Sequence, residues 1–275
     1  MSQSAPSTAS SSRPLAGAAA ATLAAAAALV PHLAEAAGEI VRKHFRTRIE
    51  IVDKSDLSPV TIADRDAEAA MRRLIGTAFP EHGLVGEEHG TERPDADWVW
   101  VLDPIDGTKS FISGLPLFGT LIALLHQGRP VLGVIDQPVS RERWLGVDGQ
   151  ASTLNGAAIR CRPCAHPSAA TLFTTSPEMF QGQDEAAFGR ARASVKLTRY
   201  GADCYAYGLV AAGFIDAVIE AQLKPYDYCA HVPILLGAGG CVTDWQGRSA
   251  GLESDGRILA SGDPALHDAL LARLG

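Results

Sequence analysis

The sequence predicts a mixed α and β fold. Its 275 residues are 47% hydrophobic, enough to form one large domain or two modest ones with proper cores. Helical and strand patterns alternate after residue 33, and the mixture returns after a turn-rich boundary at Asp148-Gly149. We therefore expect an N-terminal α/β unit over residues 31–148 and a C-terminal α/β unit over residues 149–275.

Residues 1–30 form a separate N-terminal extension. Residues 2–12 are almost entirely Ser, Ala, Thr, Gln and Pro, which cannot form a core, so we expect disorder there. The Ala-rich stretch 15–30 follows Arg13 and resembles the apolar part of a secretion signal. Alanine is too weakly apolar for a convincing membrane span, so we interpret this stretch as the extension of a helix at 33–45. We expect a cytoplasmic protein without a membrane partner.

Hydrophobic periodicity and turn residues place the other elements. A β-branched and aromatic run predicts the strand that ends at Leu102, and apolar residues at helical spacing predict the helix that ends near Pro80. In chain order, the predicted elements are helices at 33–45 and 65–78, strands at 98–103, 118–126 and 131–137, a helix at 203–213, a strand at 217–220 and a helix at 229–237.

The most informative segment reads WVWVLDPIDGTKSF. Pro104 cannot donate to a ladder and restricts the residue before it, so we expect the chain to leave the sheet at Asp103. The turn would then bring Asp106 back beside Asp103, as two hard oxygen ligands for a divalent cation. If a helix begins near Thr108, the amides of Gly107 and Thr108 would bind phosphate oxygens. Alone, the two aspartates could equally be turn caps.

Three other acidic segments favour the metal interpretation. Glu87 follows the apolar pair Leu84-Val85, where a strand enters a loop. Asp64 lies at the start of the 65–78 helix. Asp227 precedes the apolar stretch 232–236, and a helix N-cap is its simplest structural interpretation.

These segments resemble those of the inositol monophosphatase superfamily of magnesium-dependent, lithium-sensitive phosphatases. Its signature is a GEE segment, a DPIDGT segment and a later W/Y-D segment, and this chain carries all three in that order, as Gly86-Glu87-Glu88, residues 103–108 and Tyr226-Asp227. The resemblance runs from about Leu33 to the C-terminus. It implies the family's sandwich of alternating helix and sheet layers, with the metal site in the N-terminal unit and the C-terminal unit completing the active site.

The resemblance also implies a ligand set for two or three Mg²⁺ ions. Glu87, Asp103 and the carbonyl of Ile105 would hold one ion. Asp103, Asp106 and Asp227 would hold the second. Glu87 would also orient waters on a loosely bound third ion.

The same resemblance assigns the catalytic steps. Thr108 and Asp64, which matches the family's TxxD segment, would orient and deprotonate the attacking water, and Lys54 would lie on a flexible loop that closes over the site. Uncatalysed hydrolysis of a phosphate monoester is among the slowest reactions known, and divalent metals activate water and neutralise the leaving oxygen. Magnesium is favoured over zinc because the proposed ligands include neither histidine nor cysteine.

Two segments bear on the substrate. The TKSF segment at 108–111 and the GADCYAY segment at 201–207 resemble the histidinol-phosphate phosphatase branch. Histidinol phosphate carries a cationic amine, so a selective enzyme should offer a carboxylate beyond the metals, and Asp203 and Glu220 are the candidates. Asp203 could instead be a helix N-cap. Tyr205 is either a second substrate contact or a core aromatic, as is Tyr207.

The leading hypothesis is therefore hydrolysis of L-histidinol phosphate to L-histidinol and phosphate, in histidine biosynthesis. Lys109 counts among the predicted substrate contacts, but a lysine after DGT also occurs in the 3′-phosphoadenosine 5′-phosphate phosphatases. That activity, an inositol-1-monophosphatase or a broad sugar phosphatase are the alternatives. A catalytically dead regulatory homologue would have lost a ligand, and none is missing here.

The composition of the chain indicates which binding partners to expect. The chain has 24 basic and 31 acidic side chains, a formal charge of −7, and no block of Lys or Arg that would follow a nucleic-acid backbone. Five cysteines are an odd number in a long chain, unlike a disulfide framework, and we interpret Cys161-Arg-Pro-Cys164 as incidental rather than as a zinc pair. Because the family commonly forms homodimers, we expect one here.

Overall fold

The computed structural model describes residues 15–48, 51–53 and 59–275. Its helices are α1 (Gly17–His44), α2 (Ile62–Ala78), α3 (Thr108–Ile112), α4 (Gln183–Ser194), α5 (Asp203–Ala211), α6 (Pro225–Tyr228), α7 (His231–Gly237) and α8 (Pro264–Leu274), with 3-10 turns at Pro167–Ala169 and Pro177–Met179. Its strands are β1 (Ile51–Asp53), β2 (Pro59–Thr61), β3 (Gly83–Gly86), β4 (Gly90–Glu92), β5 (Trp98–Asp106), β6 (Gly119–His126), β7 (Arg129–Gln137), β8 (Glu142–Val147), β9 (Thr153–Leu154), β10 (Ala157–Ala158), β11 (Thr171–Thr174), β12 (Leu197–Tyr200), β13 (Ala217–Glu220), β14 (Cys241–Asp244) and β15 (Ile258–Ser261).

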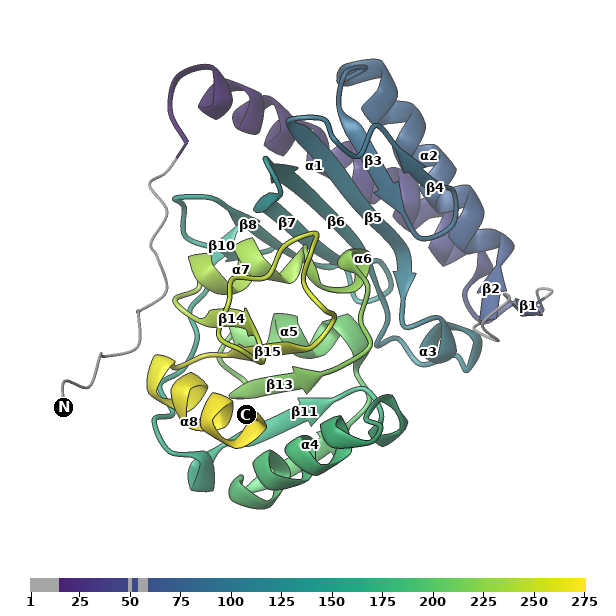
Figure 1. Ribbon diagram of the computed structural model, residues 1–275. Coiled ribbons are helices and arrows are strands. Elements are labelled where there is room, and N and C mark those ends of the chain that lie inside the picture. Colours follow the sequence, from purple (N-terminus) through teal and green to yellow (C-terminus); the bar gives the residue numbers. More distant parts are fainter. Residues whose placement is uncertain (1–14, 49–50, 54–58) are drawn as a thin grey trace.

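Two large sheets alternate with three helix layers (Figure 1), and β1 and β2 form a separate two-stranded sheet. Within the described residues the larger sheet has the order β10-β9-β8-β7-β6-β5-β3-β4, and the smaller has the order β12-β11-β13-β15-β14. Helices α1 and α2 cover the outer face of the larger sheet, α5, α6 and α7 lie between the sheets, and α4 and α8 cover the outer face of the smaller one. The predicted layered sandwich of helices and sheets is confirmed.

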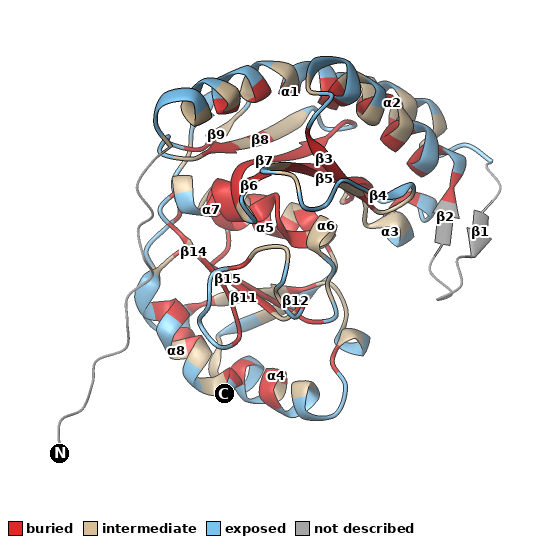
Figure 2. Cartoon of the chain, turned by 45° about the horizontal axis from the view of Figure 1, so that its top comes forward, coloured by how far each residue is buried: buried red, intermediate tan, exposed pale blue. Residues whose placement is uncertain are grey.

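The sequence of β5 shows why both faces of the larger sheet are covered. Val99 and Val101 point to the core between the sheets, whereas Trp100 and Leu102 point to the core under α1 and α2. Because successive side chains of a strand point to opposite faces, a strand buried on both faces reads as a continuous apolar run. Figure 2 shows the inner strands of both sheets as largely buried. The edge strands β4, β10 and β12 are mostly exposed.

Helix α1 joins the Ala-rich stretch and the predicted 33–45 helix into one continuous element. Its buried residues recur at helical spacing, among them Leu23, Val30 and Val41, and they pack in the core under the larger sheet. By length and composition alone this helix could cross a membrane, with a mean hydropathy of 1.5 over its most apolar window. The core helix of a globular fold passes the same test. The division of the chain at residues 30 and 148 stays a prediction.

Pro104 does not take the chain out of the sheet, contrary to our expectation. Strand β5 continues to Asp106, which pairs with Gly119, while Asp103 pairs with Leu121, so two residues of β5 oppose one of β6. This β-bulge accommodates the missing N–H of Pro104, and the Pro104 carbonyl accepts a hydrogen bond from Thr120 Oγ1 at 2.8 Å. The bulge turns both aspartates toward the same side of the strand end.

Candidate metal centre and active site

Three aspartates converge where β5 meets α6. Asp103 and Asp106 come from the bulged end of β5 and Asp227 from α6, and one carboxylate oxygen of each lies within 4.8 Å of the others. Asp103 is buried, and the other two are half-buried. They line a cavity of about 410 Å³ whose other walls include Glu87, Ile105, Gly107, Thr108, Lys109, Thr175, Asp203, Tyr207, Glu220 and His231.

Backbone amides orient all three carboxylates. Asp103 accepts from the Ile105 amide at 3.0 Å, Asp106 from the Cys204 amide at 2.6 Å, and Asp227 from the Lys224 amide at 2.6 Å. The Cys204 amide belongs to the first turn of α5, so this helix helps to fix a carboxylate carried by the other half of the chain. Such hydrogen bonds leave each carboxylate with further oxygen lone pairs for a cation.

The electrostatics of the cluster favour a bound cation. Burial, and then repulsion from Glu87, Asp106 and Asp227, raises the pKa of Asp103 well above its usual range. Burial also raises the pKa of Asp106, and it raises that of Asp227 to about 7. No ion pair within the described residues reaches any of the three aspartates. Clustered, unneutralised hard oxygen donors fit a divalent ion such as Mg²⁺.

Glu87 lines the same cavity directly after β3. Its amide donates to the Leu102 carbonyl at 3.2 Å, which extends the pairing of β3 with β5 by one residue. Its carboxylate raises the pKa values of Asp103, Asp64 and Asp227, so it lies close to all three. The structure thus brings together the four acidic side chains expected to bind metal, while their individual ligand roles stay predictions.

Asp64 lies in the first turn of α2 and is fully buried. Its Oδ2 accepts from the Thr61 amide at 2.9 Å and from Thr61 Oγ1 at 2.6 Å, while its Oδ1 is buried without a hydrogen-bond partner in the described part of the chain. Burial raises its pKa. An unpartnered buried oxygen costs free energy unless a water or ligand contacts it, which agrees with the expected role in holding water.

Thr108 begins α3, as expected. Its Oγ1 donates to the Ile105 carbonyl at 3.1 Å, which is the carbonyl expected to bind metal. Gly107 before it has φ 88°, and a Cβ at that position would meet the Asp203 side chain, with Cγ 2.8 Å away. Glycine is therefore required there both by the left-handed backbone and by the close approach of α5.

The cavity holds two further carboxylates, Asp203 and Glu220. Glu220 accepts from the Thr175 amide at 2.9 Å, from Thr175 Oγ1 at 2.6 Å and from the Tyr207 hydroxyl at 2.8 Å. Asp203 accepts from Ser110 Oγ at 2.6 Å, so the TKSF and GADCYAY segments meet directly. Asp203 is the first residue of α5 and caps no helix end through its side chain, unlike the N-cap alternative.

Some predicted contacts lie elsewhere. Tyr205 does not line the cavity: its hydroxyl donates to Glu142 at 2.7 Å and its ring packs edge-on against Trp144. Neighbouring helical residues point in different directions, and Tyr207 faces the site instead. Asp227 lies at the third position of α6 rather than at an N-cap, and it accepts from the residue before the helix. Lys54 lies outside the described residues.

Sequence reasoning missed residues that contact the site only through the fold. Thr175 follows β11 without a motif, and His231 lies in α7, stacked on Tyr207 with ring centroids 3.9 Å apart. Burial lowers the pKa of His231 to about 3, so its ring is neutral. Ser110 was visible in the TKSF segment, and its partner Asp203 was not predictable without the three-dimensional contact.

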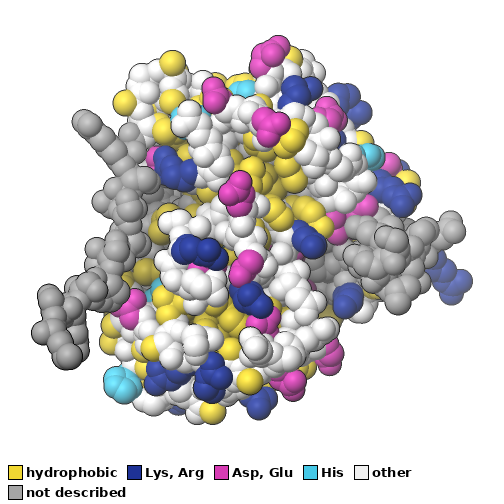
Figure 3. All heavy atoms as spheres, viewed as in Figure 1, with side chains coloured by type: hydrophobic (Ala, Val, Ile, Leu, Met, Phe, Trp, Pro, Cys, Tyr) yellow, Lys and Arg dark blue, Asp and Glu magenta, His cyan; other side chains and the backbone are white. Residues whose placement is uncertain are grey.

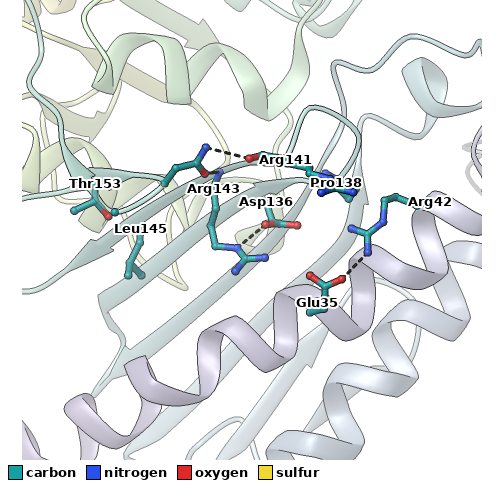
Figure 4. Close-up of a pocket in the computed structure, with 10 residues that line it drawn as sticks. Glu35, Arg42, Asp136, Pro138, Arg141, Arg143, Leu145 and Thr153 are labelled. Atoms are coloured by element: carbon teal, nitrogen blue, oxygen red, sulfur yellow. Dashed lines mark hydrogen bonds and ion pairs between the residues drawn. The ribbon is translucent and has the colours of Figure 1, made fainter.

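A second cavity, of about 440 Å³, lies between α1 and the β7 and β8 strands (Figure 4). Both of its carboxylates are in ion pairs: Glu35 pairs with Arg42, and Asp136 pairs with Arg143, both at 2.6 Å, and Arg141 adds a further positive charge. This pairing leaves no clustered carboxylates for a cation. On the face shown in Figure 3, Lys and Arg side chains are scattered among Asp and Glu side chains and do not gather in one large patch. The aspartate cavity is thus the better candidate for an active site.

The layered fold carries a cluster of three aspartates that is suited to a divalent metal ion and, through that ion, to an anionic substrate. A model of the inositol monophosphatase family matches residues 23–275, and the chain belongs to that family. It is 51% identical over 251 residues to the bifunctional phosphatase IMPL2 of Arabidopsis thaliana, covering 88% of this chain and 72% of that protein. It is 36% identical over 249 residues to the histidinol-phosphatase of Chlorobaculum parvum, covering 90% and 95%. Among solved structures, an inositol monophosphatase from Zymomonas mobilis is similar with a TM-score of 0.84 and 45% identity, covering 94% and 99% of the two chains.

Proposed function

We propose that the chain is a Mg²⁺-dependent histidinol-phosphate phosphatase. The observation that carries this proposal is a further carboxylate, Asp203, in the same cavity as the aspartate cluster. A cavity that binds a phosphate through metal ions and also offers a separate carboxylate suits a substrate whose phosphate and amine carry opposite charges. The name of the Chlorobaculum parvum relative supports the same substrate.

In this proposal the protein groups divide the work of hydrolysis. The carboxylates of the aspartate cluster, Glu87 and the Ile105 carbonyl would hold the ions. Bound magnesium would supply charge for activating water and for the leaving oxygen. Thr108 would orient the attacking water, and Asp64, whose Oδ1 has no hydrogen-bond partner among the described residues, would accept the proton.

Asp203 is the better of the two carboxylates for binding the amine. Both oxygens of Glu220 already accept hydrogen bonds from Thr175 and Tyr207, which fixes its orientation and partly satisfies it. Asp203 accepts one hydrogen bond, through Oδ2 from Ser110, and its pKa is raised mainly by burial. An ammonium group beside Asp203 would stabilise the ionised carboxylate and so lower its pKa again.

Inositol 1-phosphate is the second candidate substrate. The similar Zymomonas mobilis structure is titled an inositol monophosphatase, and the Arabidopsis thaliana relative is named bifunctional. The oriented Glu220 carboxylate can accept hydrogen bonds from sugar hydroxyls as readily as it can face an amine. Hence Glu220 favours neither substrate.

We expect phosphate release from L-histidinol phosphate to exceed release from inositol 1-phosphate by about 100-fold or more in kcat/KM, because the ammonium group of histidinol phosphate can neutralise the Asp203 carboxylate and the uncharged inositol ring cannot. The measurement is a substrate panel at one Mg²⁺ concentration, extended to 3′-phosphoadenosine 5′-phosphate. A higher kcat/KM for inositol 1-phosphate would reject the histidinol assignment and leave the phosphatase assignment intact.

Asp203→Asn should separate the amine contact from the chemistry. Asparagine keeps the size and tolerates the positive φ of 45° at this position, and it can still accept from Ser110, but it carries no charge. We expect KM for histidinol phosphate to rise by about 10 to 100-fold and turnover of inositol 1-phosphate to change by less than about threefold. Ser110→Ala is the matched control, since it keeps the charge and removes one hydrogen bond. Equal losses on both substrates in Asp203→Asn would contradict the amine contact.

A further inference from the structure

Glu68 is a buried carboxylate outside the cavity that no step of the proposed chemistry uses. It lies in α2 one turn after Asp64, with its residue fully buried. Its Oε2 accepts from the Glu88 amide at 2.7 Å, and its Oε1 accepts from the His89 amide at 3.2 Å and from Arg72 Nε at 2.7 Å. The carboxylate thus binds two consecutive amides of the turn between β3 and β4.

Arg72 makes further contacts with the same turn and with β4. Its second guanidinium nitrogen donates to Glu92 Oε1 at 2.9 Å, and its third donates to the Gly90 carbonyl. Gly86 on the other side of the turn has no room for a side chain, because a Cβ there would overlap the Glu68 carboxylate. The glycine of the GEE segment is therefore required by Glu68.

The main chain around Glu87 is hydrogen-bonded on one side to β5 and on the other side to Glu68 of α2. The Glu87 amide is bound to the Leu102 carbonyl of β5, the strand that carries Asp103 and Asp106. The next two amides are bound to Glu68 of α2, the helix that carries Asp64. With the main chain held from both sides, the Glu87 side chain leaves the turn in a fixed direction, toward Asp103. The ion pair with Arg72 is enough to neutralise the charge of the Glu68 carboxylate. The hydrogen bonds from the Glu88 and His89 amides are therefore not needed for neutralisation, and they hold the turn instead.

We propose that Glu68 is a positioning residue that holds the main chain of Glu87 and thereby sets the affinity of the centre for divalent ions. This inference rests on the proposed function, since Glu87 acts here as a ligand. Glu68 itself touches neither metal nor substrate. Groups that orient a metal ligand commonly change metal affinity by about 10 to 100-fold when they are replaced.

The test uses Glu68→Gln in the full chain. Glutamine fills the same space but turns an N–H toward one of the main-chain or Arg72 donors, so at least one contact with the turn is lost. We expect Mn²⁺ binding without substrate, followed by electron paramagnetic resonance, to weaken by about tenfold. The Mg²⁺ concentration for half-maximal activity should rise by a similar factor, and kcat at saturating Mg²⁺ should stay within about threefold of the unsubstituted value.

Asp216→Asn is the matched control. Asp216 is buried and also accepts from an arginine, Arg162, at 2.6 and 2.7 Å and from a main-chain amide, that of Thr171, at 2.7 Å, but it lies in the C-terminal half away from the cavity. It should lower thermal stability without changing Mn²⁺ affinity. If Glu68→Gln fails to fold, Arg72→Lys decides, with an expected weakening of about threefold.

Unchanged Mn²⁺ affinity in a folded Glu68→Gln protein, with a loss of stability like that of Asp216→Asn, would overturn the positioning role. Equal weakening of Mn²⁺ binding in Asp216→Asn would overturn it as well, because the effect would then be general. If the unsubstituted chain bound no Mn²⁺, the metal centre itself would fail, and the role of Glu68 with it. The three results are distinguishable within one set of titrations.

Discussion

Asp103→Asn should lower kcat/KM by about 1,000-fold or more at any Mg²⁺ concentration, because it removes the charge of the residue expected to bridge two ions. Asparagine is nearly isosteric and keeps the side-chain oxygen that accepts from the Ile105 amide, so the bulge of β5 stays in place. Phosphate release and Mn²⁺ binding measure the effect. Activity at the native level would contradict the assignment of Asp103 as a ligand.

The same substitution should stabilise the metal-free protein. In the unfolded chain at pH 8, Asp103 is ionised, so folding must either bury that charge beside Glu87 and Asp106 or take up a proton, and both cost free energy. Asparagine incurs neither cost, so we expect the unfolding free energy of the Asp103→Asn protein in EDTA to be higher than that of the unsubstituted chain. Thermal denaturation at pH 8 measures this. Lost activity with lower stability would instead indicate a damaged fold.

The sequence of the DPIDGT segment was sufficient to place the site but not to give its geometry. Local strand-end and turn signals predicted that Asp103 and Asp106 lie together, and the family resemblance added Glu87 and Asp227; all four residues line one cavity. The β-bulge was not predictable, since it depends on the pairing of β5 with β6 across the sheet. The local preferences of proline predicted that β5 ends at Asp103. In the structure, β6 continues to pair with β5 as far as Asp106.

The residues around Asp203 and Glu220 could not be placed from sequence, because their positions depend on packing rather than on local signals. Tyr205 and Tyr207 are equivalent in sequence, and only the packing of α5 decides that Tyr207 faces Glu220 while Tyr205 contacts Glu142. Thr175 carries no motif and reaches the site because β11 lies beside β13. Strand β13 of the second sheet was predicted at its observed bounds, whereas strands β11, β12, β14 and β15 and helix α8 were not predicted. Their apolar runs are brief, and long-range pairing determines them.

Removal of metal should change how stability depends on pH. Burial raises the pKa of Asp227 to about 7 in the metal-free protein, and the pKa values of Asp103, Asp106 and Asp64 are raised as well. A carboxyl whose pKa is higher in the folded state than in the unfolded chain favours folding below the unfolded value and loses that contribution as the pH rises through the folded value. We therefore expect the unfolding free energy in EDTA to fall between about pH 4 and pH 7, by about 2 to 4 kcal/mol for Asp227.

Mg²⁺ should reverse this loss, because it binds the ionised carboxylates and not the protonated ones. The rise in melting temperature on addition of Mg²⁺ should be several degrees at pH 8 and small at pH 5.5, and the apparent affinity should weaken by up to tenfold per pH unit below about pH 7 for each proton displaced. Scans at matched ionic strength with KCl in place of MgCl₂ control for general screening. An equal Mg²⁺ effect at both pH values would mean that the ion stabilises the protein at groups other than the aspartate cluster. A pH-dependent effect that persists in Asp103→Asn would assign the coupling to Asp106 and Asp227 alone.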